Sequence, residues 1–138
     1  MLYPRVSALG DRIAIEPEMR NDELFVQQIF EQAGIPVSVL TQALDPSEAE
    51  QELAFQAARS VHEVIYFCFD PHLYPQSRQF LNRLEAQSEN LKVVFLRDPF
   101  GADLLTRKTP YVCAFGFRSV QIQAAVELMV GSQVKGAV

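Results

Sequence analysis

Two short runs of the sequence, residues 64–69 and 93–96, are apolar at every position. A strand with one face in water alternates apolar and polar residues, whereas a strand covered on both faces is apolar throughout. Fully covered strands are typical of parallel sheets that carry helices on both sides. This feature predicts an α/β fold and argues against an antiparallel sandwich.

The rest of the chain alternates β-rich runs with amphipathic runs. Further strands are expected at residues 13–15, 37–40 and 112–115, and helices at 23–33, 48–61, 75–86 and 119–130. Strands that alternate with helices imply parallel pairing and right-handed crossovers. We therefore predict one domain over residues 1–138, a three-layer α/β/α sandwich with a mostly parallel sheet of about five strands.

Capping residues suggest where these helices begin and end. Asp22 is expected to cap the first helix, Asp45 to cap the second with Glu48 completing a capping box, and Gly131 to end the last. The spacing of apolar residues predicts the buried side of each helix. For the second helix this stripe is Ala49, Leu53, Ala57 and Val61, and for the third it is Phe80, Leu81 and Leu84.

Charge and hydropathy narrow the range of partners. The formal net charge is −5 and the twelve basic residues are scattered, so the chain lacks the basic patch of a nucleic-acid binder. No apolar run approaches the roughly 20 residues of a membrane-spanning helix. We therefore expect neither nucleic acid nor a membrane span, and either a cytoplasmic or an exported location fits the composition.

The sequence contains no signature of a metal or cofactor site. Cys68 and Cys113 each lie inside an apolar run and are expected to be free thiols; a disulfide requires their strands to be close. No second ligand lies at metal-site spacing. A G-x-G-x-x-G turn, a glycine-rich phosphate loop with lysine and a hydroxyl-rich flavin loop are all missing. We expect no cofactor.

Ligands of open parallel sheets bind at the carboxyl ends of the strands, so the loops there hold the candidate site. Asp70 and His72 follow the third strand, and Arg97, Asp98 and Phe100 follow the fourth. Asp70 and His72 are either an acid/base pair or parts of a tight turn. An exposed phenylalanine beside Arg97 and Asp98 suits a contact surface. We expect these residues to cluster at one sheet edge, with Phe100 partly exposed.

A phospho-receiver domain is an alternative that these loops fit loosely. Glu16, Glu18 and Asp70 stand near the positions of its acidic residues. The fifth strand, however, is followed by Gly116, Phe117 and Arg118, where a receiver needs lysine. Because the acidic residues fit and the lysine does not, a stand-alone flavodoxin-like or receiver-like module is kept as the second interpretation.

The order of motifs from Ala57 to Gly136 resembles the C-terminal α/β domain of family 3 glycoside hydrolases. Residues 70–72, Asp-Pro-His, stand where that family often has Asn-Ala-His, and residues 97–101, Arg-Asp-Pro-Phe-Gly, stand where it has Arg-Asn-Pro-Tyr-Asp. Residues 126–131 stand where the family has a helix closing on Phe-Gly-Glu, and residues 135–138 stand where a Pro-x-Gly-Lys-Leu-Pro-Val segment begins. Gly101 and Asp70 depart from the pattern, since the family usually has Asp and Asn there.

The resemblance implies a non-catalytic role for this chain. In the family the nucleophilic aspartate lies on an N-terminal barrel, and some members add a glutamate in the loop that matches residues 70–75, where this chain has none. The loop resembles the β-N-acetylhexosaminidase branch. The resemblance thus implies a C-terminal fragment of a two-domain enzyme, without a catalytic residue, that packs on the barrel of the same polypeptide and shapes the rim of a carbohydrate cleft. The isolated chain is expected to be inactive.

Overall fold

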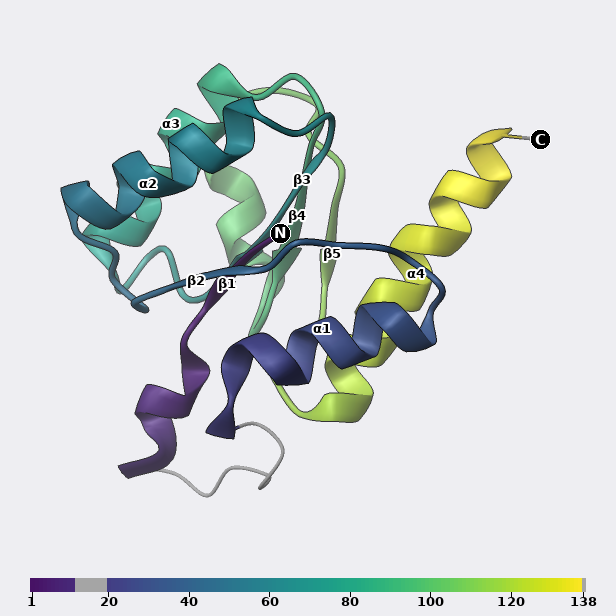
Figure 1. Ribbon diagram of the computed structural model, residues 1–138. Helices are drawn as coiled ribbons and strands as arrows, with labels where there is room; N and C mark the ends of the chain where they lie inside the picture. Colours follow the sequence, from purple (N-terminus) through teal and green to yellow (C-terminus); the bar gives the residue numbers. More distant parts are fainter. Residues whose placement is uncertain (12–19, 138) are drawn as a thin grey trace.

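The fold is a five-stranded parallel sheet between two layers of helices (Figure 1). The computed structural model describes residues 1–11 and 20–137. The strands pair in the order β2-β1-β3-β4-β5, and every pairing is parallel. Their bounds are β1 Leu2–Pro4, β2 Leu40–Gln42, β3 Val64–Cys68, β4 Leu91–Phe95 and β5 Tyr111–Cys113. The predicted α/β class is confirmed.

Helices cover both faces of the sheet, each over a separate apolar core. Helices α1 (Asp22–Gln32) and α4 (Ser119–Ala137) pack on one face, and α2 (Glu48–Arg59) and α3 (Pro75–Gln87) pack on the other. Two 3₁₀ helices, η1 (Val6–Asp11) and η3 (Pro99–Leu104), follow β1 and β4. No described helix is long and apolar enough to cross a bilayer.

The two apolar runs form the centre of the sheet, as the sequence predicts. β3 pairs with β4 along its whole length, from Val64 opposite Leu91 to Cys68 opposite Phe95. Side chains of β3 alternate between the two cores, so Phe67 lies in the α1/α4 core and Tyr66 in the α2/α3 core. Continuous hydrophobicity is required here because both faces are buried.

The first strand lies elsewhere than predicted. Residues 13–15 fall outside the described residues, and the strand that follows the N-terminus is β1, Leu2–Pro4. Tyr3 is fully buried and stacks edge-to-face on Phe67 at 5.3 Å between ring centroids. A strand of three residues at the start of a chain is too short for periodicity to reveal it.

The join between β1 and β3 is a single register pair, Leu2 opposite Tyr66. Alternate residues of a strand face alternate neighbours, so Pro4 is the next β1 residue on the β3 side. Proline has no backbone N–H to give to the ladder. The pairing of β1 with β3 therefore ends after one position.

Strand β2 begins three residues later than the predicted strand at 37–40. Its register sets Leu2 opposite Leu40, and the Leu40 N–H donates to the Met1 carbonyl at 2.9 Å. Residues before Leu40 run past the start of β1 and have no described strand beside them. The position of the edge strand is thus set by its neighbour and not by its own apolar run.

Capping of the second helix also differs from the prediction. Ser47 is the N-cap of α2 and forms a capping box with Glu50. Asp45 instead caps α3, because its carboxylate accepts from the Gln76 N–H at 2.9 Å and from the Ser77 N–H at 3.2 Å. The N-cap residue of α3 itself, Tyr74, makes no side-chain cap. A loop thirty residues upstream therefore supplies the carboxylate that this helix end lacks.

Asp45→Ala is expected to lower the free energy of unfolding by about 1 kcal/mol, the usual cost of a lost N-cap acceptor. Urea denaturation followed by circular dichroism measures it. Asp103→Ala, at an exposed aspartate, is the matched control and should change stability by less than about 0.5 kcal/mol. Equal stabilities for the two variants would show that the Asp45 cap contributes nothing.

Helix α2 buries a different side from the predicted stripe. Leu53 is 60 % exposed and Val61 is 48 % exposed, whereas Ala54 and Phe55 are buried with Gln51. The Gln51 amide donates to the Pro46 carbonyl, and its oxygen accepts from Arg83. A glutamine with both ends hydrogen-bonded can be buried, and so it replaces an apolar residue in the stripe.

The N-terminus of the first helix and the C-terminus of the last helix also differ from the prediction. Asn21, not Asp22, caps α1 and accepts from the Leu24 N–H at 3.1 Å. Asp22 is buried and accepts from the N–H and the hydroxyl of Ser7 instead. Helix α4 does not end at Gly131 but continues to Ala137. A glycine ends a helix only where the chain turns left-handed, and α4 makes no such turn at Gly131.

Candidate functional site

The loops after β3 and β4 meet at the carboxyl edge of the sheet through an ion pair. Because Cys68 lies opposite Phe95, Asp70 and Arg97 leave the sheet side by side. The Arg97 guanidinium donates to the Asp70 carboxylate at 2.6 Å. The Asp70 side chain is only 7 % exposed, while that of Arg97 is 52 % exposed. The pair holds the two loops together and presents its cationic half to solvent.

Asp70 has a backbone conformation that non-glycine residues rarely adopt. Its φ is 42°, and its carbonyl accepts from the N–H groups of Leu73 and Tyr74. Aspartate tolerates this left-handed region better than most residues. Residues 70–74 therefore form a tight turn, and strain of this kind persists where surrounding contacts determine the backbone.

His72 and Asp98 are also used to fix loops. His72 Nε2 lies 3.1 Å from the Phe100 carbonyl oxygen, which joins the β3 loop to η3. The Asp98 carboxylate accepts from the Phe100 N–H at 3.0 Å at the start of η3. Asp70 and His72 thus each bind the β4 loop, and no hydrogen bond joins them in the described part of the chain. The contacts that these two residues make are those of a tight turn.

A third loop, after β5, reaches the same edge and was not singled out from the sequence. Phe115 has a φ of 57° and is 67 % exposed. The next N–H, of Gly116, donates to the Leu96 carbonyl, and the Gln121 amide donates to the Phe115 carbonyl. No residue pattern marks this loop, because Phe115 continues the apolar run of residues 111–115 that predicts the strand.

Apolar side chains project from all three loops. Leu73 is 70 % exposed, Phe100 is 66 % exposed and Phe115 is 67 % exposed. We call these three residues, with Arg97, the carboxyl-edge rim. Exposed apolar groups beside an arginine on loops with fixed backbones are typical of a protein contact surface.

The two cysteines are separated within the sheet. Cys68 of β3 and Cys113 of β5 both lie opposite Phe95 of β4, one on each side of it. Two strand spacings are about 9.6 Å, beyond the reach of a disulfide. Burial raises the pKa of the Cys68 thiol to about 12, so this thiol is unreactive near neutral pH. No described group of three metal-binding side chains forms a site.

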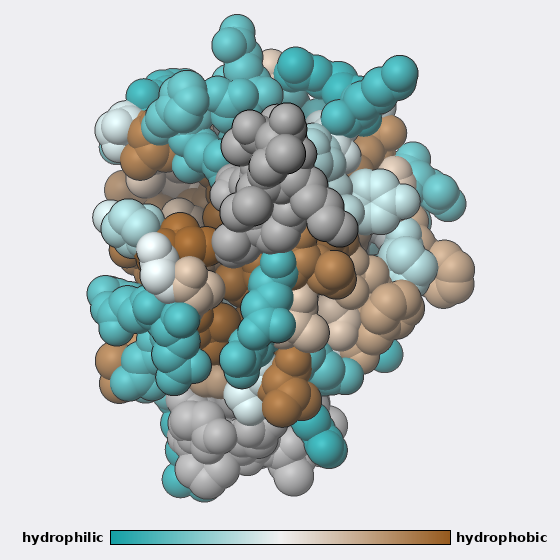
Figure 2. Space-filling view, turned by 90° about the vertical axis from the view of Figure 1, so that its right-hand side faces the viewer, coloured by the Kyte–Doolittle hydropathy of each residue, from teal (hydrophilic) through white to brown (hydrophobic). Residues whose placement is uncertain are grey.

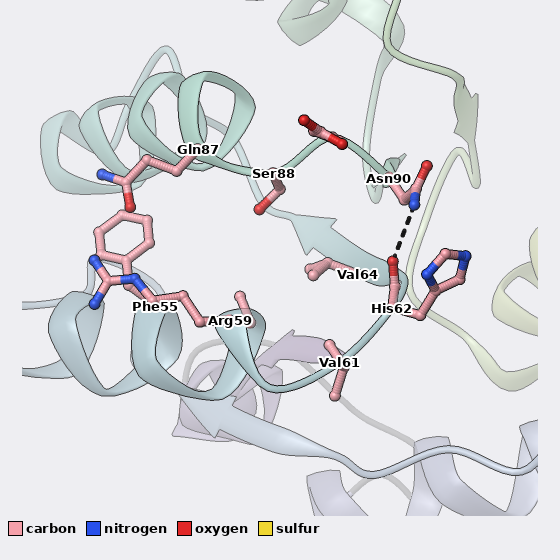
Figure 3. A pocket seen from close by; sticks show the side chains of 10 residues that line it. Phe55, Arg59, Val61, His62, Val64, Gln87, Ser88 and Asn90 are labelled. Atoms are coloured by element: carbon pink, nitrogen blue, oxygen red, sulfur yellow. Dashed lines mark hydrogen bonds between the residues drawn. The ribbon is translucent and has the colours of Figure 1, made fainter.

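A hollow of about 420 Å³ lies at the opposite, amino end of the strands (Figure 3). It opens between the last turns of α2 and α3, and Phe55, Arg59 and Gln87 line one side of it. On the other side the Asn90 amide donates to the His62 carbonyl at 3.2 Å. Open parallel sheets bind ligands at the carboxyl ends of their strands, so we place the site at the rim and not here.

Apolar surface is not confined to the rim. Figure 2 shows apolar side chains in the middle of the side on which α4 lies, with hydrophilic side chains around them. Helices α1 and α4 carry exposed Leu24, Val120 and Leu128. The rim differs from this surface because its apolar side chains stand on loops fixed by an ion pair and by side-chain hydrogen bonds.

The strand order and the two helical layers define an open, doubly wound α/β sandwich. The same fold occurs in a solved structure, a glycoside hydrolase family 3 beta-N-acetylglucosaminidase from Paenibacillus sp. str. FPU-7, with a TM-score of 0.72 and 19 % sequence identity. The match covers 92 % of this chain and 24 % of that chain. No protein-family model and no curated protein matches the sequence. The predicted resemblance is thus confirmed at the level of the fold.

Proposed function

We propose that the chain is a non-catalytic accessory domain of a family 3 glycoside hydrolase, C-terminal to a catalytic barrel of the same polypeptide. The observation that carries the proposal is the shared fold, which spans nearly all of this chain and about a quarter of the Paenibacillus enzyme. The ordered motifs after β3 and β4 support it independently of the structure.

The carboxyl-edge rim is the surface we assign to the barrel. Interfaces between domains of one chain bury about 600–1,500 Å² and mix apolar with polar groups. Leu73, Phe100 and Phe115 supply the apolar part, and the exposed half of Arg97 supplies charge. A cleft rim formed where the two domains meet would also bring Arg97 and His72 near a bound carbohydrate.

Under this proposal the isolated chain does not catalyse glycoside hydrolysis. Glycoside hydrolysis generally needs two carboxyl groups that flank the scissile bond. The loop after β3 has no glutamate, and its one carboxylate, Asp70, is paired with Arg97. The purified chain is expected to release no nitrophenol from aryl β-N-acetylglucosaminide or from aryl β-glucoside. Turnover that follows the protein through purification and disappears in Asp70→Asn would overturn this expectation.

The domain assignment is tested with the barrel itself. A barrel encoded upstream in the same reading frame, expressed without this domain, is expected to bind the separately expressed chain in calorimetry and to gain activity on binding. Phe100→Ser should weaken binding at least tenfold, whereas Leu128→Ser, at an exposed leucine of α4, should not. A reading frame without a barrel, or binding that both variants leave unchanged, would contradict the proposal.

A further inference from the structure

Strand β2 is an edge strand, and among the described residues no strand pairs with its outer side. It is the terminal strand in the order β2-β1-β3-β4-β5, and in Figure 1 it crosses in front of the other strands. The edge segment begins before β2, because Ser38 already binds Met1, and β2 itself pairs with β1 over Leu40–Gln42. In a strand the backbone groups of alternate residues face opposite neighbours. Half of the backbone groups of this segment must therefore face away from β1.

The hydrogen bonds identify which residues face inward. The Ser38 carbonyl accepts from the Met1 amine at 2.8 Å, the Leu40 N–H donates to the Met1 carbonyl at 2.9 Å, and the Gln42 carbonyl accepts from the Arg5 N–H at 2.7 Å. The even-numbered residues thus bind β1.

The odd-numbered residues Val37, Val39 and Thr41 face outward by the same alternation. Across residues 1–11 and 20–137, the backbone groups of Val37 and Val39 make no hydrogen bond. The edge of the sheet therefore carries a row of unpaired donors and acceptors.

This edge lacks the usual protection against pairing. Edge strands of monomeric proteins commonly carry charges, bulges or outward-facing prolines. No residue between Glu31 and Asp45 is charged. Pro36 is even-numbered, so its missing N–H belongs to the inward row and leaves the outward row complete.

We propose that a second copy of this chain pairs with the edge, antiparallel and centred on Val39. The two-fold axis places Val39 opposite Val39 of the other copy and Val37 opposite Thr41. In antiparallel pairing, each such pair of outward residues exchanges two hydrogen bonds. The segment is uncharged, so self-pairing brings no like charges together, and the contact is isologous as in most homodimers. The result is one continuous sheet through both copies.

Two hollows adjoin the segment. One of about 280 Å³ is lined by Met1, Val39 and Leu40, and one of about 570 Å³ is lined by Ile35, Pro36 and Val37. Val61 lines both and is 48 % exposed. The side chains of Val37, Val39 and Thr41 are half-buried in the single copy, so pairing along this edge removes further apolar surface from water.

The test is a variant that removes only an outward donor. Val39→Pro deletes the outward N–H and leaves every bond to β1 in place, and Val39→Ala shortens the same side chain but keeps the N–H. Analytical ultracentrifugation of the wild-type chain is expected to give twice the 15.6 kDa chain mass at high concentration and the chain mass on dilution. Val39→Ala should remain dimeric, whereas Val39→Pro should lose the dimer.

Hydrogen exchange measured by NMR locates the contact. The amides of Val37, Val39 and Thr41 should be protected at high concentration and exchange freely on dilution. If Val39→Pro fails to fold, Ser38→Lys decides the question, because it adds like charges to both copies at an exposed position and should also abolish the dimer. A chain that is monomeric at every concentration, a dimer unaffected by these variants, or outward amides protected even in the monomer would overturn the proposal. None of these outcomes bears on the proposed function.

Discussion

Glu85→Ala is expected to lower the free energy of unfolding by about 1–3 kcal/mol, because it leaves several donors without their acceptor. Glu85 is 2 % exposed and lies in the last turn of α3, beside the segment that leads into β5. Its carboxylate accepts from the N–H and hydroxyl of Thr106, both at 2.7 Å, and from the Thr109 hydroxyl at 2.8 Å and the Arg107 N–H at 3.3 Å. One side chain thus fixes the whole connection between η3 and β5.

Chemical denaturation followed by circular dichroism measures this loss. Glu89→Ala is the matched control, since Glu89 is an exposed glutamate just beyond the same helix. It should change stability by less than about 0.5 kcal/mol. A loss below about 1 kcal/mol for Glu85→Ala would show that the segment holds its place without the carboxylate.

The same site predicts a pH dependence. Burial alone would raise the pKa of Glu85, but the hydrogen bonds from Thr106, Thr109 and Arg107 outweigh it and leave the pKa below its ordinary value. A carboxyl whose folded pKa is lowered stabilises the protein above its unfolded pKa, and this stabilisation is lost as the pH falls through the folded value. Stability should therefore fall on the acid side of the ordinary glutamate pKa, and Glu85→Gln should make the fall shallower.

Gly101→Asp, which introduces the residue that the family usually has, is expected to destabilise the chain by about 4 kcal/mol or to prevent folding. Gly101 is buried, and a Cβ there would lie 2.4 Å from the Phe95 ring and 3.0 Å from Pro71. The aspartate would add an unpaired charge to this clash. Glycine at position 101 is therefore required by the packing of Phe95 and Pro71.

A double-mutant cycle tests whether the clash with the Phe95 ring causes this loss of stability. Gly101→Ala should cost about 1–3 kcal/mol by overpacking alone. In the background of Phe95→Leu, which removes the clashing ring atoms, the same substitution should cost less, with a coupling of about 1 kcal/mol. Gly34→Asn serves as control, because Gly34 has a φ of 75° but open space around it. Additive costs at positions 95 and 101 would contradict the packing explanation.

The central part of the fold follows from the sequence because its signals are local. Strand β3 is apolar throughout and β4 is apolar except at Lys92, and the inward residues of α3, Phe80, Leu81 and Leu84, are buried as their spacing predicts. The loop residues after β3 and β4 could be placed at one edge because parallel strands end together. These elements need no knowledge of a distant partner.

The errors arise where a distant segment decides the structure. The start of β2 is set by its register with Leu2, and Asp45 caps a helix other than its own. Gln51 is buried because Pro46 and Arg83 satisfy its amide. Phe115 was missed because a left-handed backbone at a non-glycine residue has no sequence signature. The periodicity of a sequence shows how its apolar residues are spaced, but it does not show which distant residues a segment will contact.

Pro4 limits the backbone pairing between β1 and β3 to one register position. With one register pair between β1 and β3, the β2-β1 part is joined to β3-β4-β5 mainly through side chains, above all Tyr3 and Phe30 against the Phe67 ring. Strands joined by a backbone hydrogen-bond ladder resist separation along their whole length. Strands joined mainly by side-chain contacts can separate in one step, at a free energy below that of global unfolding. We therefore expect the β1-β2 part of the sheet to open as one unit at a lower free energy than the strands that carry the rim, which native-state hydrogen exchange measures.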